Sequence, residues 1–91
     1  MITVFGIPNT MTLDKIQKQI KYQIIDFSDE LKSDASLARL QQLGMTIGAP
    51  VELVRKAPIF RDPLLISVES TNLAISKAQA SHILVQEVSN G

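Results

Sequence analysis

The sequence predicts a mainly β domain with one short helix, folded as a small β-barrel of about five strands. Two observations carry this prediction. Short apolar runs recur along the chain between polar or turn-forming residues, and leucines at helical spacing separate the first run from the second. The five runs expected to be strands are Tyr22–Phe27, Val51–Val54, Leu64–Val68, Leu73–Ser76 and Ile83–Val88.

An extension and a short helix are expected before the first strand. Residues 1–11 are predicted to be an N-terminal extension, and residues 12–89 the domain itself. The extension is either a frayed terminus or an apolar arm that pairs with an edge strand or with a second copy of the chain. Thr12 can cap a short helix at its N-terminus. Three apolar residues would share one face of this helix: Leu13, Ile16 and Ile20.

The main helix is expected over Asp34–Leu43, after a polar connection at Ser28–Ser33. Its first turn can be capped by the side chain of Ser33 or Asp34. One face of this helix carries leucines three residues apart, which is typical of a helix packed against a core: Leu37, Leu40 and Leu43.

Two glycines are predicted to end this helix and to turn the chain toward the next strand. Gly44 follows the last leucine, and glycine readily adopts the left-handed conformation that terminates a helix. Met45 can then fold back onto Leu40, as in a Schellman motif. Gly48 lies in the following turn, Thr46–Pro50.

The second half of the predicted domain consists of strands joined by short connections. In these strands large apolar residues recur at every second position, the pattern of strands with one buried face: Leu64, Ile66 and Val68 alternate with Leu65, Ser67 and Glu69, and Leu73 and Ile75 with Ala74 and Ser76. Ser70–Asn72 can turn between them, and the alanine-rich segment Lys77–His82 fits a helical turn before the last strand. Five short strands at close spacing, with one helix between the first two, indicate an SH3-like barrel.

Composition excludes several classes of protein. Nine basic residues balance nine acidic ones, and only one tyrosine and three phenylalanines are present, which argues against a nucleic-acid binder. The absence of cysteine removes disulfides and thiolate metal sites. The N-terminus lacks the pattern of a signal peptide, and no apolar run reaches the length of a membrane span. We therefore expect a cytoplasmic protein.

The sequence offers little for catalysis or for cofactor binding. A nucleophilic triad needs a histidine, and His82, beside the apolar run that starts at Ile83, is the single histidine. The serines are not in a Gly-x-Ser-x-Gly elbow, and Gly44 and Gly48 lack the Gly-Lys-Ser/Thr ending of a phosphate-binding loop. We expect no enzymatic activity, no catalytic residue and no bound cofactor.

A metal site is not expected either. Iron and zinc sites draw on three or more histidine, cysteine or carboxylate ligands. The densest acidic cluster is Asp29 and Glu30 with Asp34, where a polar connection meets a helix N-terminus. The helix dipole alone explains carboxylates at that place.

The remaining candidates for function are surfaces. The loop Ile59, Phe60, Arg61 and Asp62 lies between two prolines that stiffen it, and aromatic and arginine side chains dominate binding hot spots. Phe60 could instead fold back and plug one end of the barrel. Met45 and Ile47 are the second candidate, with packing of Met45 against Leu40 as the alternative.

Taken together, the order of these motifs resembles the FeoA family, ferrous iron transport protein A. The resemblance covers about residues 12–89 and includes Leu43-Gly44-Met45, Gly48, Ala57-Pro58, Asp62-Pro63 and the strands around them. The chain departs from the family at Gln19, where a glycine is common, so we expect the first helix to continue for up to one turn. It also departs at Phe60-Arg61, where the family connection is often shorter.

This resemblance implies a small cytoplasmic accessory protein of bacterial ferrous iron uptake. Such a protein would act by docking on the membrane transporter FeoB, which carries a GTP-binding cytoplasmic domain. The alternative is an SH3-like regulatory domain of a metal-dependent transcriptional repressor system. Because this chain has no room for a helix-turn-helix, it would then need a separate DNA-binding partner. Weak homo-oligomerisation is left open.

Overall fold

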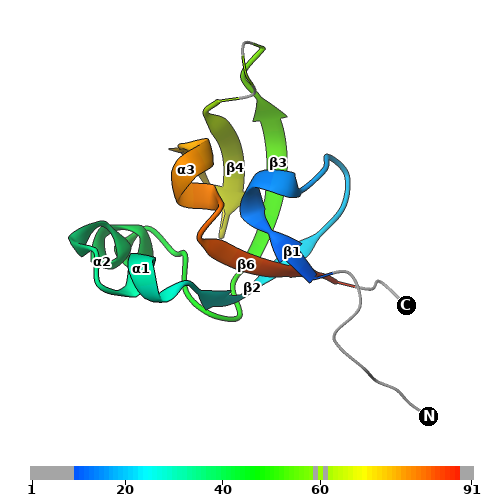
Figure 1. Cartoon of the computed structure of the whole chain (residues 1–91). Coiled ribbons are helices and arrows are strands. Elements are labelled where there is room, and N and C mark those ends of the chain that lie inside the picture. The colour runs from blue at the N-terminus through cyan, green and yellow to red at the C-terminus, as the bar shows by residue number, and fades with distance from the viewer. Residues whose placement is uncertain (1–9, 59, 61, 89–91) are drawn as a thin grey trace.

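A six-stranded antiparallel sheet forms the centre of the structure, a computed structural model that describes residues 10–58, 60 and 62–88 (Figure 1). The strands occur in the order β1-β6-β2-β3-β4-β5. Their bounds are β1 Thr10–Thr12, β2 Tyr22–Phe27, β3 Pro50–Lys56, β4 Leu64–Val68, β5 Thr71–Ile75 and β6 Ile83–Glu87.

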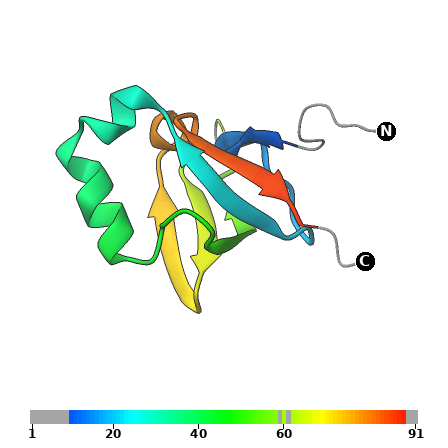
Figure 2. The same ribbon diagram turned by 90° about the horizontal axis from the view of Figure 1, so that it is seen from below.

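Among the described residues, four short helices accompany the sheet. They are the 3₁₀ turn η1 Leu13–Lys15 and the α-helices α1 Asp29–Lys32, α2 Ala35–Gln42 and α3 Lys77–Ala80. The helices α1 and α2 lie together to one side of the sheet (Figures 1 and 2). The loop that joins β3 to β4 lies at the end of these two strands that is far from α1 and α2 (Figure 1). We call α1 and α2 the helical lobe, and the β3–β4 loop the hairpin loop.

The mainly β, SH3-like architecture predicted from the sequence is confirmed, with the main helix between β2 and β3. Two details differ. A three-residue strand, β1, adds to β6, and in the described part of the chain the ladder ends at β1 and β5 instead of closing. A twisted sheet can curl around its own core without joining its edges. An isolated bridge between Lys18 and Leu53 ties the segment after η1 to β3.

The core is apolar throughout. Among the residues that the structure describes, none with a polar or charged side chain is buried. The alternation seen in β4 places Leu64, Ile66 and Val68 inside with no exposed surface. Full burial of one such side chain contributes about 1.5–3 kcal/mol to folding, so this strand is a main source of stability.

Helix α2 begins and ends with specific hydrogen bonds. The Asp34 side chain accepts a hydrogen bond from the N–H of Ser36 at 2.9 Å. At the other end, the N–H of Gly44 donates to the carbonyl of Gln41, and that of Met45 to the carbonyl of Leu40, each at 3.1 Å. These two bonds form a Schellman motif. Gly44 has a φ of +108°, at which a residue with a side chain would be strained.

The segment Ser28–Ser33, which we expected to be a polar connection, contains the helix α1. The side-chain oxygen of Ser28 caps it by accepting a hydrogen bond from the N–H of Leu31. The Leu31 side chain is buried in the core. The Ser28 cap and the buried Leu31 contribute to holding this single turn, which is too short to show a helical periodicity in the sequence.

Two further expectations need correction. The first helix is one 3₁₀ turn whose Thr12 makes no side-chain cap, and it ends at Lys15 instead of continuing. Gln19 lies in a turn with φ of 68°, so it adopts the backbone conformation that a glycine would favour. The β4–β5 turn consists of Glu69 and Ser70, not Ser70–Asn72. Both residues have positive φ, as two-residue hairpin turns of type I′ require.

Candidate partner-binding site

The hairpin loop presents an aromatic side chain to solvent. The Phe60 side chain is 84% exposed, so it does not plug the barrel. Its φ of 59° is unusual for a bulky residue. The N–H of Ala57 donates to the carbonyl of Pro63 at 3.0 Å and closes the base of the loop. Ile59 and Arg61, predicted to accompany Phe60, lie outside the described residues.

Asp62 connects the hairpin loop to α3. One of its carboxylate oxygens accepts a hydrogen bond from the N–H of Lys77 at 2.9 Å. Lys77 is the first residue of α3, where backbone N–H groups lack partners within the helix. The Asp62 side chain is therefore used in holding the loop in place, and it remains exposed.

Two cavities lie beside the hairpin loop. One, of about 190 Å³, is lined by the apolar groups of the loop base and of β4 and β5, with one cation: Ala57, Pro58, Pro63, Leu65, Ala74 and Arg55. The other, of about 340 Å³, is polar and contains three lysines: Asp14, Lys15, Gln17, Lys56 and Lys77. The hairpin loop thus has an apolar hollow at its base. The basic hollow is lined by Lys56, which precedes the loop, and by Lys77, whose N–H donates to Asp62.

Ile47 is 63% exposed in the turn between α2 and β3, close to Leu43, which is 42% exposed. This turn precedes β3, whereas the hairpin loop follows it (Figure 1). The seven residues of β3 span roughly 20 Å at about 3.3 Å per residue. The two surfaces predicted from the sequence are therefore separate.

Met45 is removed from the candidate partner-binding residues. Its side chain has no exposed surface and belongs to the core, which is the alternative that the sequence left open. The reason is the Schellman motif, because the hydrogen bond to Leu40 turns the chain back toward the core.

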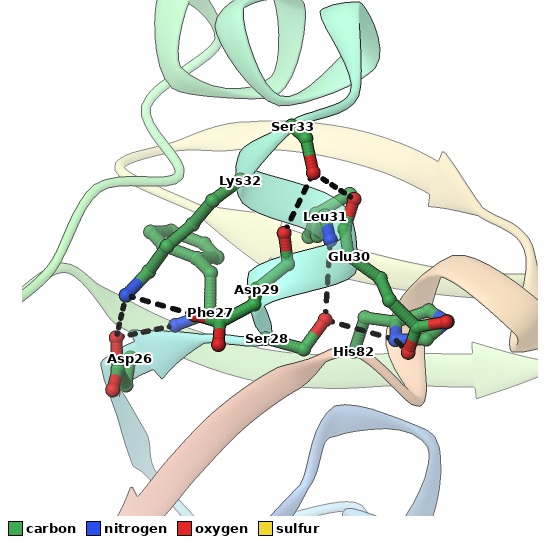
Figure 3. Close-up of polar contacts among 9 residues, drawn as sticks. All are labelled: Asp26, Phe27, Ser28, Asp29, Glu30, Leu31, Lys32, Ser33 and His82. Carbon is green, nitrogen blue, oxygen red and sulfur yellow. Dashed lines mark hydrogen bonds and ion pairs between the residues drawn. The ribbon is translucent and has the colours of Figure 1, made fainter.

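His82 takes part in the attachment of α1 to β6, not in a triad (Figure 3). Its Nδ1 atom lies 2.9 Å from the hydroxyl oxygen of Ser28 and 3.7 Å from a carboxylate oxygen of Glu30. A triad instead uses the two ring nitrogens separately, one for the serine and one for the carboxylate. The N–H of Ser28 also donates to the His82 carbonyl at 2.8 Å. Sequence spacing could not reveal this pairing of residues 54 positions apart.

The pKa of the Asp26 carboxyl lies below the ordinary value of 3.8. The main cause is the N–H of Phe27, which donates to its carboxylate at 2.8 Å (Figure 3). The Lys32 ammonium, 3.5 Å away, adds a favourable charge. Both interactions stabilise the ionised carboxylate.

Within the described ranges, no three histidine or acidic side chains come together as a metal-binding group. One oxygen of Asp14 is buried without a hydrogen-bond partner. None of the helices in the same ranges is long and apolar enough to cross a membrane.

The fold is that of an SH3-like domain, and its candidate functional sites are exposed surfaces. A family profile described as the FeoA domain matches residues 11–87. Since this match covers most of the chain, the protein belongs to the FeoA family. Membership implies an accessory role in ferrous iron transport. Comparison with curated proteins finds no match.

Solved structures agree with this assignment. FeoA from Stenotrophomonas maltophilia, a prokaryotic SH3 domain protein solved in complex with zinc, is 30% identical, with a TM-score of 0.72 over 84% of this chain and 89% of that one. An iron uptake regulatory protein (FeoA) is 23% identical, with a TM-score of 0.71 over 87% of this chain and 97% of that one.

The same fold occurs in a different class of protein. A manganese-dependent transcriptional repressor is 14% identical, with a TM-score of 0.74 over 93% of this chain. The chain spans 45% of the repressor's length. At this identity the likeness concerns the fold alone.

Proposed function

We propose that the protein is a cytoplasmic, non-enzymatic accessory factor of ferrous iron uptake that docks on the membrane transporter FeoB, at or near its GTP-binding domain. Family membership supports the role in iron transport. The main observation in favour of docking is that Phe60 is exposed in a loop whose ends are fixed by hydrogen bonds of Ala57, Asp62 and Pro63. A pre-ordered loop loses less entropy on binding than a flexible one.

The proposed docking surface is the hairpin loop from Ile59 to Asp62, with Ile47 as the second candidate. Because these residues lie at opposite ends of β3, a partner either covers the length of the strand or uses one end. We place the main contact at Phe60, since an exposed aromatic side chain can fill a pocket on a partner.

Binding of the purified full chain to purified FeoB from the same organism tests the proposal. We expect a saturable complex, and we expect the full chain to restore ferrous iron uptake in a strain that lacks it. Absence of binding and of restored uptake would overturn the proposed function. Specific recovery of a DNA-binding protein in place of the transporter would support the repressor-type alternative.

A further inference from the structure

Charge is separated in this neutral protein. The chain has nine basic and nine acidic residues in total. The two cavities beside the hairpin loop are lined by four cationic side chains and one carboxylate: Lys15, Arg55, Lys56, Lys77 and Asp14. Acidic residues gather instead at the end of β2 and on the helical lobe: Asp26, Asp29, Glu30 and Asp34. With the exposed carboxylate of Asp62 included, a partner approaching the hairpin loop meets four cationic side chains and two carboxylates, a surface of net positive charge.

The same surface has an apolar projection. Phe60 is the most exposed large apolar side chain described, and its backbone has positive φ. Non-glycine residues in this conformation are strained, and such strain is common where a side chain is held for binding. The bonds from Ala57 to Pro63 and from Lys77 to Asp62 hold the loop on both sides.

An apolar cavity at the base of the hairpin loop favours a protein as the partner. It is a hollow of about 190 Å³ between the loop base and the outer sides of β4 and β5, and Arg55 lines it. A protein partner can present a side chain of a size that fills this hollow. A projection beside a hollow is the form of an interlocking protein interface.

We propose that this hairpin surface, made of Phe60 and the two cavities beside it, binds an acidic segment of a protein partner that also carries a large apolar side chain. Phe60 enters an apolar pocket of the partner, and the partner's apolar side chain enters the hollow beside Arg55. Acidic side chains of the partner lie opposite Lys15 and Lys77. The identification of this partner with the transporter's cytoplasmic region rests on the proposed function.

Kinetics of the full chain with the purified cytoplasmic region of FeoB test the inference at low and moderate salt. Phe60→Ala is expected to raise Kd about 10- to 100-fold, as loss of a hot-spot aromatic does. The double change Lys15→Glu with Lys77→Glu is expected to slow association about tenfold at low salt and less at higher salt. The matched control, Lys21→Glu with Arg39→Glu, changes the net charge equally away from the hairpin surface and should bind like wild type.

The outcomes separate the two proposals. If the wild type does not bind the transporter, both fail. If the wild type binds but the hairpin variants bind equally well, only this inference fails. It also fails if the control pair, Lys21→Glu with Arg39→Glu, weakens binding as much as Lys15→Glu with Lys77→Glu does. Two other partners are also tested. Binding to vesicles of phosphatidylglycerol tests a lipid surface, and light scattering tests self-association with a second copy. Loss of vesicle binding or of self-association in the hairpin variants, with unchanged transporter binding, would overturn the inference in favour of a lipid surface or a second copy.

Discussion

The N–H of Met45 donates to the carbonyl of Leu40 at 3.1 Å and brings the Met45 side chain into the core at the end of α2. The bond is possible because Gly44, between them, has φ of +108°. A glycine thus links the end of a helix to the burial of the next residue, and this relation determines which residues of the turn reach the surface.

Gly44→Val is expected to lower the free energy of unfolding by roughly 1–2 kcal/mol or more, because a branched side chain would be strained at this φ. An added Cβ would also lie 3.4 Å from the Val68 side chain. Thermal unfolding measures the effect. Gly48→Val is the matched comparison: its φ of +94° also strains a side chain, but its added Cβ meets nothing within 4 Å, so a greater loss in Gly44→Val reports the contact with Val68. An unchanged Tm for Gly44→Val would contradict the prediction.

Gln19→Gly is expected to raise stability by up to about 1 kcal/mol, because φ of 68° costs a non-glycine residue more than it costs glycine. Gln42→Gly, at the last residue of α2, should lower stability by up to about 1 kcal/mol. Chemical denaturation of both variants gives the comparison. A loss of stability in Gln19→Gly equal to that in Gln42→Gly would show that the turn does not need this conformation.

Phe60→Asn should separate stability from binding. Asparagine tolerates positive φ better than phenylalanine, so we expect unchanged stability or a gain of up to about 1 kcal/mol. Binding to the transporter should weaken as in Phe60→Ala. Denaturation and affinity measurements on the same preparation decide the matter. A large loss of stability would mean that Phe60 packs in the core.

Asp26 should make stability depend on pH in the acid range. Its pKa is lower in the folded state, so its contribution is present above the ordinary value of 3.8 and is lost as the pH falls through the lower folded value. The stability difference between wild type and Asp26→Asn should therefore shrink below pH 3.8. Lys32→Ala should remove only part of this dependence, because the Phe27 N–H remains. A difference that stays constant with pH would refute this role.

The purified monomer is expected not to bind Fe(II) or Zn(II) tightly, since a set of three suitable ligands is absent from the described residues. Calorimetric titration in chelator-free buffer checks this. A stoichiometric isotherm of micromolar or tighter affinity that disappears in His82→Ala would disprove the prediction and would place a site where His82 and Glu30 meet.

Local patterns in the sequence were enough to predict most of the regular structure. The alternation of Leu64–Val68 predicted β4, because a strand with one buried face must alternate along its length. The apolar run Tyr22–Phe27 matches β2, although a bulge between Ile24 and Asp26 interrupts its alternation. The leucine spacing and the cap at Asp34 likewise predicted α2. These signals are local, since both depend on the period of the backbone itself.

Two elements without such a period, α1 and β1, were not predicted. Helix α1 is one turn held by contacts of Ser28 with His82, which is distant in the chain, and β1 exists through its pairing with β6. A single turn or a three-residue strand is unstable alone, so distant partners determine whether it forms.

The sequence alone determined the class of fold, the family and the two turns that carry candidate surface residues. Only the tertiary structure decided which of these residues are accessible: Met45 is buried, Phe60 projects, and Ile47 lies at the far end of β3. It also brought basic residues from η1, β3 and α3 to the side of the hairpin loop. The reason is physical: periodicity follows from neighbours along the chain, whereas exposure and the grouping of charges follow from packing between segments that are distant along it.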